Sequence, residues 1–295
     1  MAGTPHRRCR SKLSHLLTLI KFLDSGNRRP ALKNSVTLGA VLLIFTNTAL
    51  AIELRAETVD SFNKFIASVE TRLEPRFSGR TFLWSDESPG VRQQLLNGTV
   101  IAQPMQGNGV VSLKGGLVQD WRGAVFISHA SLRDVLSVAQ DYDHHSDFYK
   151  PDIENAKIES RQGDEFLVYM RIMKTKFMLS DVLNMEQFIQ FIHLDSQRVY
   201  SRAYSKRINE VAAPGRSGER ELPSGQDRGL LWRLYGYWFY EERDDGVYIT
   251  CESITLTRDI PFGLSALLGP VIHDLPGESL RKSLEQTRRA VVSRH

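Results

Sequence analysis

The sequence predicts an α+β fold in which a curved antiparallel sheet packs on a long C-terminal helix, preceded by a signal segment and a further helix. Three observations indicate this fold. Helical spacing occurs before and after a long run of strand-like segments, the run extends from Pro151 almost to Pro261, and Asp245-Gly246 forms a two-residue hairpin turn within it. Successive strands bracketed by helices are typical of α+β proteins and not of parallel sheets.

Four segments have helical spacing. In the first, Phe62, Ile66 and Val69 recur at three- and four-residue steps and form one apolar stripe. In the second, Ser131 and Asp134 resemble a capping box, in which two residues satisfy each other's free backbone groups. The expected helices are 57–72, 128–140, 264–274 and 278–293, with one further turn at 91–96.

The spacing changes to that of strands after Leu96. The expected strands are 99–103, 117–127, 153–161, 165–173, 177–194, 198–211, 231–243 and 247–258. The polar segment 214–229 lies between two of them. We therefore expect it to be a loop over the sheet and not a domain boundary.

The first 51 residues have the pattern of a secretory signal. An apolar run, Val36–Phe45, follows a basic stretch and leads to Ala49-Leu50-Ala51, a small-x-small site with cleavage expected after Ala51. A retained N-terminal anchor is the alternative, and a buried core helix is a third. Segment 27–33 resembles a degenerate twin-arginine export motif. The expected location is periplasmic or secreted, or membrane-anchored if the segment is retained.

The net charge is unevenly distributed along the chain. The whole sequence has 38 basic and 34 acidic residues, a formal charge of +4. Residues 1–51 contain eight of the bases and one of the acids, which leaves 30 bases and 33 acids in the remainder. The body is therefore slightly acidic, and the sequence does not predict a surface that binds nucleic acid.

One short segment gathers several side chains of the kinds that ligate metals. Asp141, His144, His145 and Asp147 occur within seven residues, and metal sites use these groups at short spacing. Two adjacent histidines do not easily face one ion, and no further His or Cys lies nearby in sequence. We therefore interpret the segment as a polar helix-to-strand connection and predict neither a metal site nor a cofactor.

The last predicted hairpin carries the candidate ligand-binding face. With Asp245-Gly246 as the turn, Asp244 lies opposite Val247, and residues on alternate positions of the two strands share a face. Polar and aromatic residues on this face and on a neighbouring strand could fix the head group of a bound molecule. The candidate residues are Arg202, Tyr204, Arg233, Tyr235, Tyr237 and Glu252.

The sequence does not decide which face of the sheet points inward. Trp232, Trp238 and Tyr240 alternate with the candidate residues and form the rival inward face. In that case the candidate residues would form a salt-bridged outer face.

Segment 131–151 resembles the START-like (SRPBCC) superfamily, in particular its polyketide cyclase and coenzyme Q-binding branch. It is similar to that branch's helix followed by an Asp-aromatic motif, a Phe and a Pro, although His145-Ser146 stands where relatives often have Tyr-Pro. Segment 267–284 is similar to the branch's final helix, and the resemblance covers about 115–293. It implies a helix-grip fold with a cavity for a lipid, a quinone or a polyketide-like guest.

The resulting organisation is a signal segment or anchor over 1–51, a helical extension over 52–98 and a START-like domain over 99–295. The first functional hypothesis is extracytoplasmic binding of a hydrophobic small molecule, with membrane association possible only through the N-terminal segment. An interaction module with a filled pocket, whose contact would be 214–229, is an alternative. A cyclase or aromatase is another, although the sequence has no phosphate loop, G-x-S-x-G or H-E-x-x-H motif and identifies no catalytic residue.

Overall fold

The computed structural model describes residues 54–79, 81–176, 179–223, 227–259 and 265–294. The predicted signal segment, 1–51, lies outside them. Within these ranges, no helix combines the length and the apolar character needed to span a bilayer.

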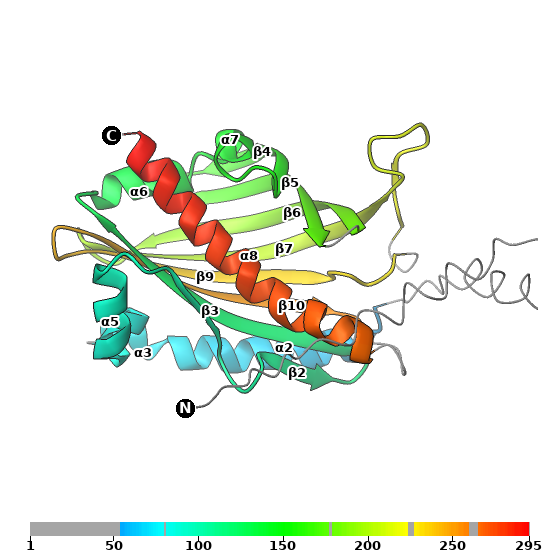
Figure 1. The fold of residues 1–295 in the computed structure, drawn as a ribbon, viewed down its shortest axis with the longest axis horizontal. Coiled ribbons are helices and arrows are strands. Elements are labelled where there is room, and N and C mark those ends of the chain that lie inside the picture. The colour runs from blue at the N-terminus through cyan, green and yellow to red at the C-terminus, as the bar shows by residue number, and fades with distance from the viewer. Residues whose placement is uncertain (1–53, 80, 177–178, 224–226, 260–264, 295) are drawn as a thin grey trace, which may run out of the picture. The chain divides into compact units, whose positions relative to one another are not determined.

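A ten-stranded antiparallel sheet is the centre of the fold, with the strand order β1-β3-β10-β9-β7-β6-β5-β4, while β2 pairs with β3 and β8 with β7 (Figure 1). The strands are β1 Ile101–Pro104, β2 Val110–Leu113, β3 Gly116–Ser128, β4 Ile153–Gln162, β5 Glu165–Lys176, β6 Leu179–His193, β7 Arg198–Ala212, β8 Arg220–Glu221, β9 Arg233–Glu242 and β10 Gly246–Thr257. All eight predicted strands are present. The sequence reasoning missed the short strands β2 and β8.

Helices cover both faces of this sheet. They are α2 Ala56–Leu73, α3 Pro75–Ser78, α4 Trp84–Glu87, α5 Pro89–Leu96, α6 Leu132–Ala139, the 3-10 turn η1 Tyr142–His144, α7 His145–Phe148 and α8 Ser265–Ser293. The predicted capping box opens α6, where the Ser131 backbone N–H donates to Asp134 Oδ2 (2.9 Å). The two expected C-terminal helices are one helix, because Pro276 and Gly277 do not interrupt α8. A proline removes one helical hydrogen bond, which the packing of α8 against the sheet offsets.

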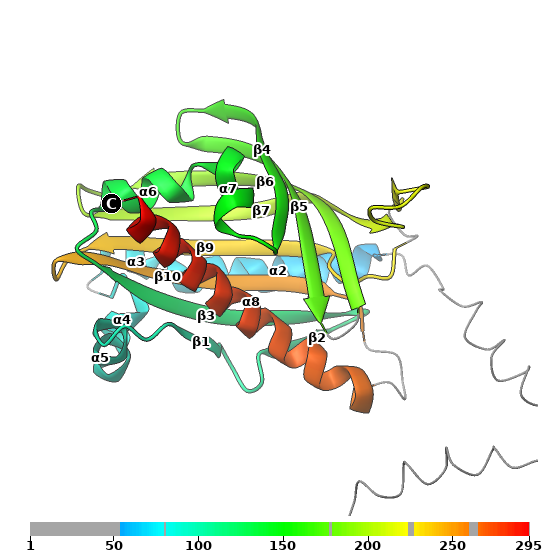
Figure 2. The same cartoon turned by 45° about the horizontal axis from the view of Figure 1, so that its top comes forward.

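The helices divide the core into two layers. Figures 1 and 2 place α8 on one face of the sheet and α2 on the other. We call the face toward α8, with Val125, Tyr240 and Ile249, the inner face, and the face toward α2, with Tyr237 and Ile254, the outer face. The α+β helix-grip architecture is therefore confirmed, and the N-terminal helices add a second apolar layer to it.

The helix α8 approaches the sheet most closely at β3, where glycines remove the side chains in between. A Cβ added to Gly123 would lie 2.7 Å from Leu284 Cδ1 and 3.0 Å from Leu280 Cγ. A Cβ added to Gly277 would lie 2.3 Å from the indole of Trp121. Real Cβ atoms do not come so near, so both positions require glycine.

The turn of the last hairpin is one residue earlier than predicted. Asp244 and Asp245 are its central residues, with φ of 57° and 59°, and Val247 pairs with Glu242 instead of Asp244. Both central residues of this turn type need positive φ, which Asp tolerates better than most residues. The pairing is shifted by two residues, so the predicted division of residues between the two faces remains correct.

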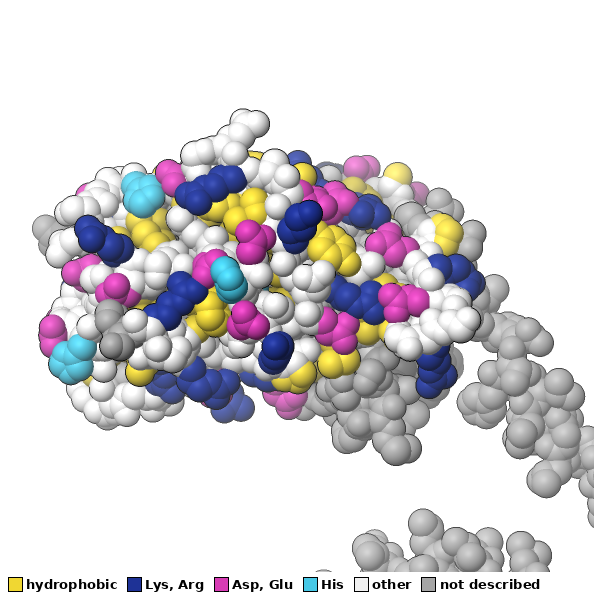
Figure 3. Space-filling view, turned by 90° about the horizontal axis from the view of Figure 1, so that it is seen from above, with side chains coloured by type: hydrophobic (Ala, Val, Ile, Leu, Met, Phe, Trp, Pro, Cys, Tyr) yellow, Lys and Arg dark blue, Asp and Glu magenta, His cyan; other side chains and the backbone are white. Residues whose placement is uncertain are grey.

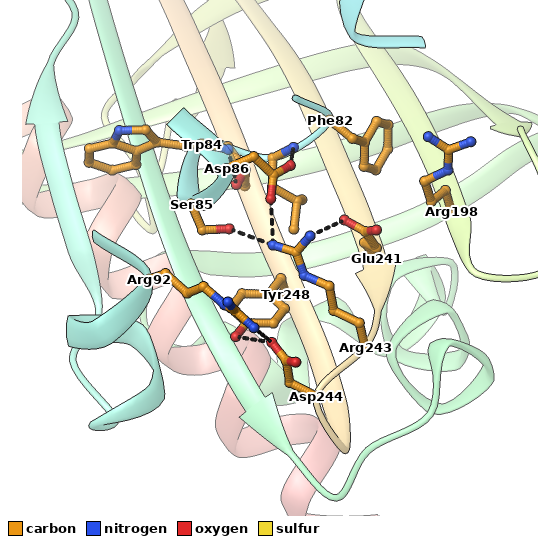
Figure 4. A network of polar contacts seen from close by, with 12 residues as sticks. Phe82, Trp84, Ser85, Asp86, Arg92, Arg198, Glu241, Arg243, Asp244 and Tyr248 are labelled. Atoms are coloured by element: carbon orange, nitrogen blue, oxygen red, sulfur yellow. Dashed lines mark hydrogen bonds and ion pairs between the residues drawn. The ribbon is translucent and has the colours of Figure 1, made fainter. Parts of the chain in front are cut away.

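A polar network attaches the N-terminal helices to this hairpin (Figure 4). Arg243 Nη2 donates to Asp86 Oδ1 (2.5 Å) and to Ser85 Oγ (3.2 Å), and its Nη1 lies 3.4 Å from Glu241 Oε2. The Asp86 side chain is only 10% exposed. One guanidinium therefore serves two largely buried carboxylates from α4 and β9.

The Gly277 contact makes a prediction about stability. Gly277→Ala should lower the free energy of unfolding by about 1–3 kcal/mol, because the methyl group displaces the Trp121 indole. Ala in a helix interior is otherwise favoured over Gly by about 1 kcal/mol. The control is Gly90→Ala in α5, where the nearest heavy atom is 4.0 Å away and stability should stay equal or rise. Urea unfolding measures both, and equal effects would contradict the close packing of α8.

The Figure 4 network makes a second prediction. Arg243→Ala should destabilise the fold by about 1–3 kcal/mol, because it leaves the Asp86 and Glu241 carboxylates without their cation. Arg92→Ala is the matched control, since its pair with Asp244 (2.6 Å) is more exposed. That loss should be below about 1 kcal/mol. Thermal unfolding compares the two, and a larger loss for Arg92→Ala would refute the assignment.

Candidate functional site

The six predicted ligand-binding residues all belong to the outer face, beneath or beside α2. Tyr204 and Tyr237 each donate a hydroxyl hydrogen bond to Glu70 Oε1 (3.1 Å). The Tyr235 ring packs edge-on against Phe62, with 5.3 Å between ring centroids. This face is therefore not the one that closes on α8, and α2 supplies polar partners that the sequence reasoning missed.

The two predicted arginines have different environments. Arg202 Nε donates to Gln190 Oε1 (3.0 Å), and its guanidinium lies 5.8 Å from the Tyr204 ring centroid. Arg233 Nη1 donates to the backbone carbonyl of Trp232 (2.8 Å). The structure brings Arg202 and Tyr204 together and leaves Arg233 at the start of β9.

The rival set of aromatic residues is divided between the two faces. Trp238 and Tyr240 pack in the inner-face core, as expected for that set. Trp232 packs in the outer-face core instead, and its indole N–H donates to Asp227 Oδ1 (3.3 Å). This part of the prediction was wrong, because Trp232 precedes β9 and does not follow its alternation.

Glu252 belongs to a buried charge cluster. Arg72 makes two hydrogen bonds to its carboxylate, at 2.5 and 3.1 Å. Asp120 lies nearby on β3, is 7% exposed, and its Oδ1 has no hydrogen-bond partner among the described residues. Burial raises the pKa of Asp120 to about 7, the Glu252 carboxylate adds to the rise, and Arg72 and Arg122 oppose it.

The inner face has a row of residues that crosses five strands, with polar side chains on four of them. Gln187 pairs with Ser205, whose Oγ accepts a hydrogen bond from the Leu234 N–H (3.0 Å). Leu234 pairs with Thr255, and Thr255 Oγ1 donates to Gln119 Oε1 (2.9 Å). Gln187 is 8% exposed, and neither of its amide atoms is among the fully buried polar atoms of the described residues that lack a hydrogen-bond partner.

Small residues form the floor beside this row. Ala203 pairs with Gly236, and Gly236 pairs with Ser253. Nearby, Trp238 and Leu234 pack on the inner core and remain partly exposed. A largely buried amide, a group of small residues and partly exposed apolar side chains beside them are features of small-molecule sites.

A signal for Gln187 was present in the sequence. Met185, Ile189 and Phe191 occupy the same inner face of β6 and belong to its core. Gln187 interrupts this apolar alternation at its centre. A polar residue at a core position requires a partner, and this rule could have identified it.

The segment with possible metal ligands forms a helix-to-strand connection. His144 Nδ1 lies 2.7 Å from Asp141 Oδ1, and Asp147 pairs with Lys150. His145 is buried against the rings of Tyr142 and Tyr149, and burial lowers its pKa to about 4. Within the described part of the chain, no three His, Cys, Asp or Glu side chains are placed to hold a metal ion.

Charges of both signs are mixed on the described surface. Figure 3, which views the molecule from above, shows basic and acidic side chains interspersed with small apolar areas. Ion pairs such as Arg171–Glu154 (2.8 Å) are typical of this mixture. The face in view has no field of a single sign that would attract a nucleic acid.

Comparison with known proteins places the chain by its fold. No family model matches the sequence, and no curated protein matches it either. A STAR-related lipid transfer protein from Xanthomonas axonopodis is 19% identical, with a TM-score of 0.37, covering 60% of this chain and 99% of that one. Human STARD10 is 9% identical, with a TM-score of 0.39 and coverage of 70% and 78%. The Zhui aromatase/cyclase from Streptomyces sp. R1128 is 11% identical, with a TM-score of 0.37 and coverage of 60% and 95%.

The resemblance is one of fold. The chain is similar to solved structures of proteins with different activities, each with a TM-score below 0.5. Identities this low do not transfer a ligand or a reaction, so any function must be argued from the site itself.

The charge cluster on the outer face predicts a pH dependence. The folded pKa of Asp120 is about 7 and that of an unfolded Asp is about 3.9, so the folded state binds this proton more tightly. The free energy of unfolding should therefore fall as the pH rises from about 4 to about 7. Asp120→Asn should remove this slope and be more stable than the native protein at pH 8, by on the order of 1 kcal/mol or more.

Denaturant unfolding between pH 4.5 and 8 measures the slope. Asp60→Asn, an exposed position on α2, is the control and should behave like the native protein. Identical slopes for native protein and Asp120→Asn would show that Asp120 does not hold a proton near neutral pH.

Proposed function

We propose that the protein binds a hydrophobic small molecule on the inner face of the sheet, beneath α8, and that Gln187 hydrogen-bonds its one polar group. The guest belongs to the class of lipids, quinones and polyketide-like molecules. A carbonyl or hydroxyl oxygen on an otherwise apolar body fits a single amide on an otherwise apolar face.

The observation that carries this proposal is Gln187, a polar side chain only 8% exposed among the apolar inner-face residues of β6. A polar side chain at a core position costs free energy unless it has a hydrogen-bond partner, so a fold without a role for it would favour an apolar residue there. Ala203, Gly236 and Ser253 next to it are small residues, and a Cβ added to Gly236 would lie 3.0 Å from Trp238 Nε1. The partly exposed Trp238 and Leu234 offer apolar walls.

The position of α8 also supports binding on this face. The helix contacts β3 through the two glycines, and its described half packs there through Leu280 and Leu284. The small floor residues lie on β7, β9 and β10, beside the glycine contact. A guest would thus occupy the sheet next to the helix and would not have to separate the two.

Titration with Nile red, a neutral dye with a carbonyl group, tests the proposal. We expect one dye per protein, with a blue-shifted emission. Ala203→Leu should fill the floor and weaken binding at least tenfold, and Gln187→Leu should weaken it about 3- to 10-fold, the value of one hydrogen bond.

Two variants keep the test decisive. Ser253→Leu fills the same floor from β10 and replaces Ala203→Leu if that protein does not fold. Ala67→Leu, on the exposed side of α2, is the volume-matched control and should bind as the native protein does. Unchanged binding in both floor variants would refute the inner-face site.

A further inference from the structure

The outer face has a cavity of its own, separate from the proposed inner site. It has a volume of about 350 Å³ and opens between the end of α2, α3 and the strands β6 and β7. Its lining is Glu70, Leu73, Glu74, Phe77, Ile192, Leu194, Tyr200 and Arg202. We call it the outer groove. Its volume lies within the range of small-molecule sites, about 300–1,000 Å³.

The apolar part of the groove is a continuous wall. Ile192 on β6 and Leu194 just after this strand are partly exposed, and Leu73 of α2 is buried behind the opening. The Phe77 ring packs against Tyr200, with 4.6 Å between centroids. This wall presents both aliphatic and aromatic surface to an occupant.

The charged part of the groove has both signs, fixed on opposite walls. Glu70 of α2 is held by the hydroxyls of Tyr204 and Tyr237 (3.1 Å each), and Glu74 is exposed one helical turn further on. Arg202 of β7 is held by Gln190 through Nε (3.0 Å). Among the ion pairs of the described residues, none joins Arg202 to either glutamate.

Charge complementarity identifies the occupant. A purely anionic molecule would meet Glu70 and Glu74, and a purely cationic one would meet Arg202, so each would pay a like-charge penalty. A molecule with both charges satisfies both walls. Tyr200 and Phe77 add aromatic surface that attracts a quaternary ammonium group.

We propose that the outer groove is a second binding site, which takes a zwitterionic amphiphile. Its anionic group pairs with Arg202, its cationic group lies at Glu70 and Glu74, and its apolar chain lies against Ile192 and Leu194. The site does not depend on the inner-face proposal, because the two lie on opposite faces of the sheet and share no residue.

Calorimetric titration of the full chain with four octyl amphiphiles, each below its critical micelle concentration, tests this site. The head groups are phosphocholine (zwitterionic), sulfate (anionic), trimethylammonium (cationic) and glucoside (neutral). We expect octylphosphocholine to bind at least about tenfold more tightly than the other three. Equal affinities, or a preference for one of the singly charged head groups, would overturn the proposal.

Variants locate the binding. Arg202→Gln and Glu70→Gln should each weaken octylphosphocholine binding about tenfold, and Gln at position 70 can still accept from the two tyrosines. Ile192→Trp fills the groove without changing a charge and should abolish binding. Arg233→Gln, on the same face but outside the lining, should bind as the native protein does. Binding that survives Ile192→Trp would show that the amphiphile lies elsewhere.

Discussion

The contact between α8 and β3 is the constraint on which the rest of the structure depends. Gly123 on the strand and Gly277 on the helix let the two backbones approach, with the Trp121 indole against Gly277. Because the helix is held at this edge of the inner face, the strands β9, β7 and β6 can carry small and polar residues. The same contact therefore fixes the position of α8 relative to the proposed inner-face site.

The outer face of the sheet is also covered: the helices α2 to α5 pack against it and form a second apolar core. Several polar groups inside that layer are paired, since Glu70 accepts from two tyrosines and Arg72 donates to Glu252, whereas Asp120 Oδ1 has no partner among the described residues. Buried pairs of this kind contribute specificity of docking more than stability, since desolvation offsets much of their attraction. The N-terminal helices are thereby held in one position on the strands.

Sequence reasoning recovered the strands because residues alternate between the two faces along each of them. The predicted pairing of the last hairpin was shifted by two residues, an even number, so each residue was still assigned to the correct face. It could not choose the inward face. A sheet exposed on one side alternates apolar and polar residues, but here Tyr237 and Phe239 on one side match Trp238 and Tyr240 on the other. Both faces are buried, so the pattern that would orient the sheet is absent. The groups contributed by α2, such as Glu70, depend on packing between segments more than a hundred residues apart.

Because helices cover both faces of the sheet, the N-terminal helices cannot be separated from it without exposing apolar side chains. The predicted boundary at residue 99 separates the helical extension from the START-like part, yet the apolar side chains of Phe62, Phe82 and Trp84 are nearly inaccessible within the sheet's outer layer. Removal of the extension would uncover Tyr237, Phe239 and neighbouring rings as one large apolar area. Such an area promotes self-association, so we expect a chain that lacks the extension to aggregate more readily than the full chain.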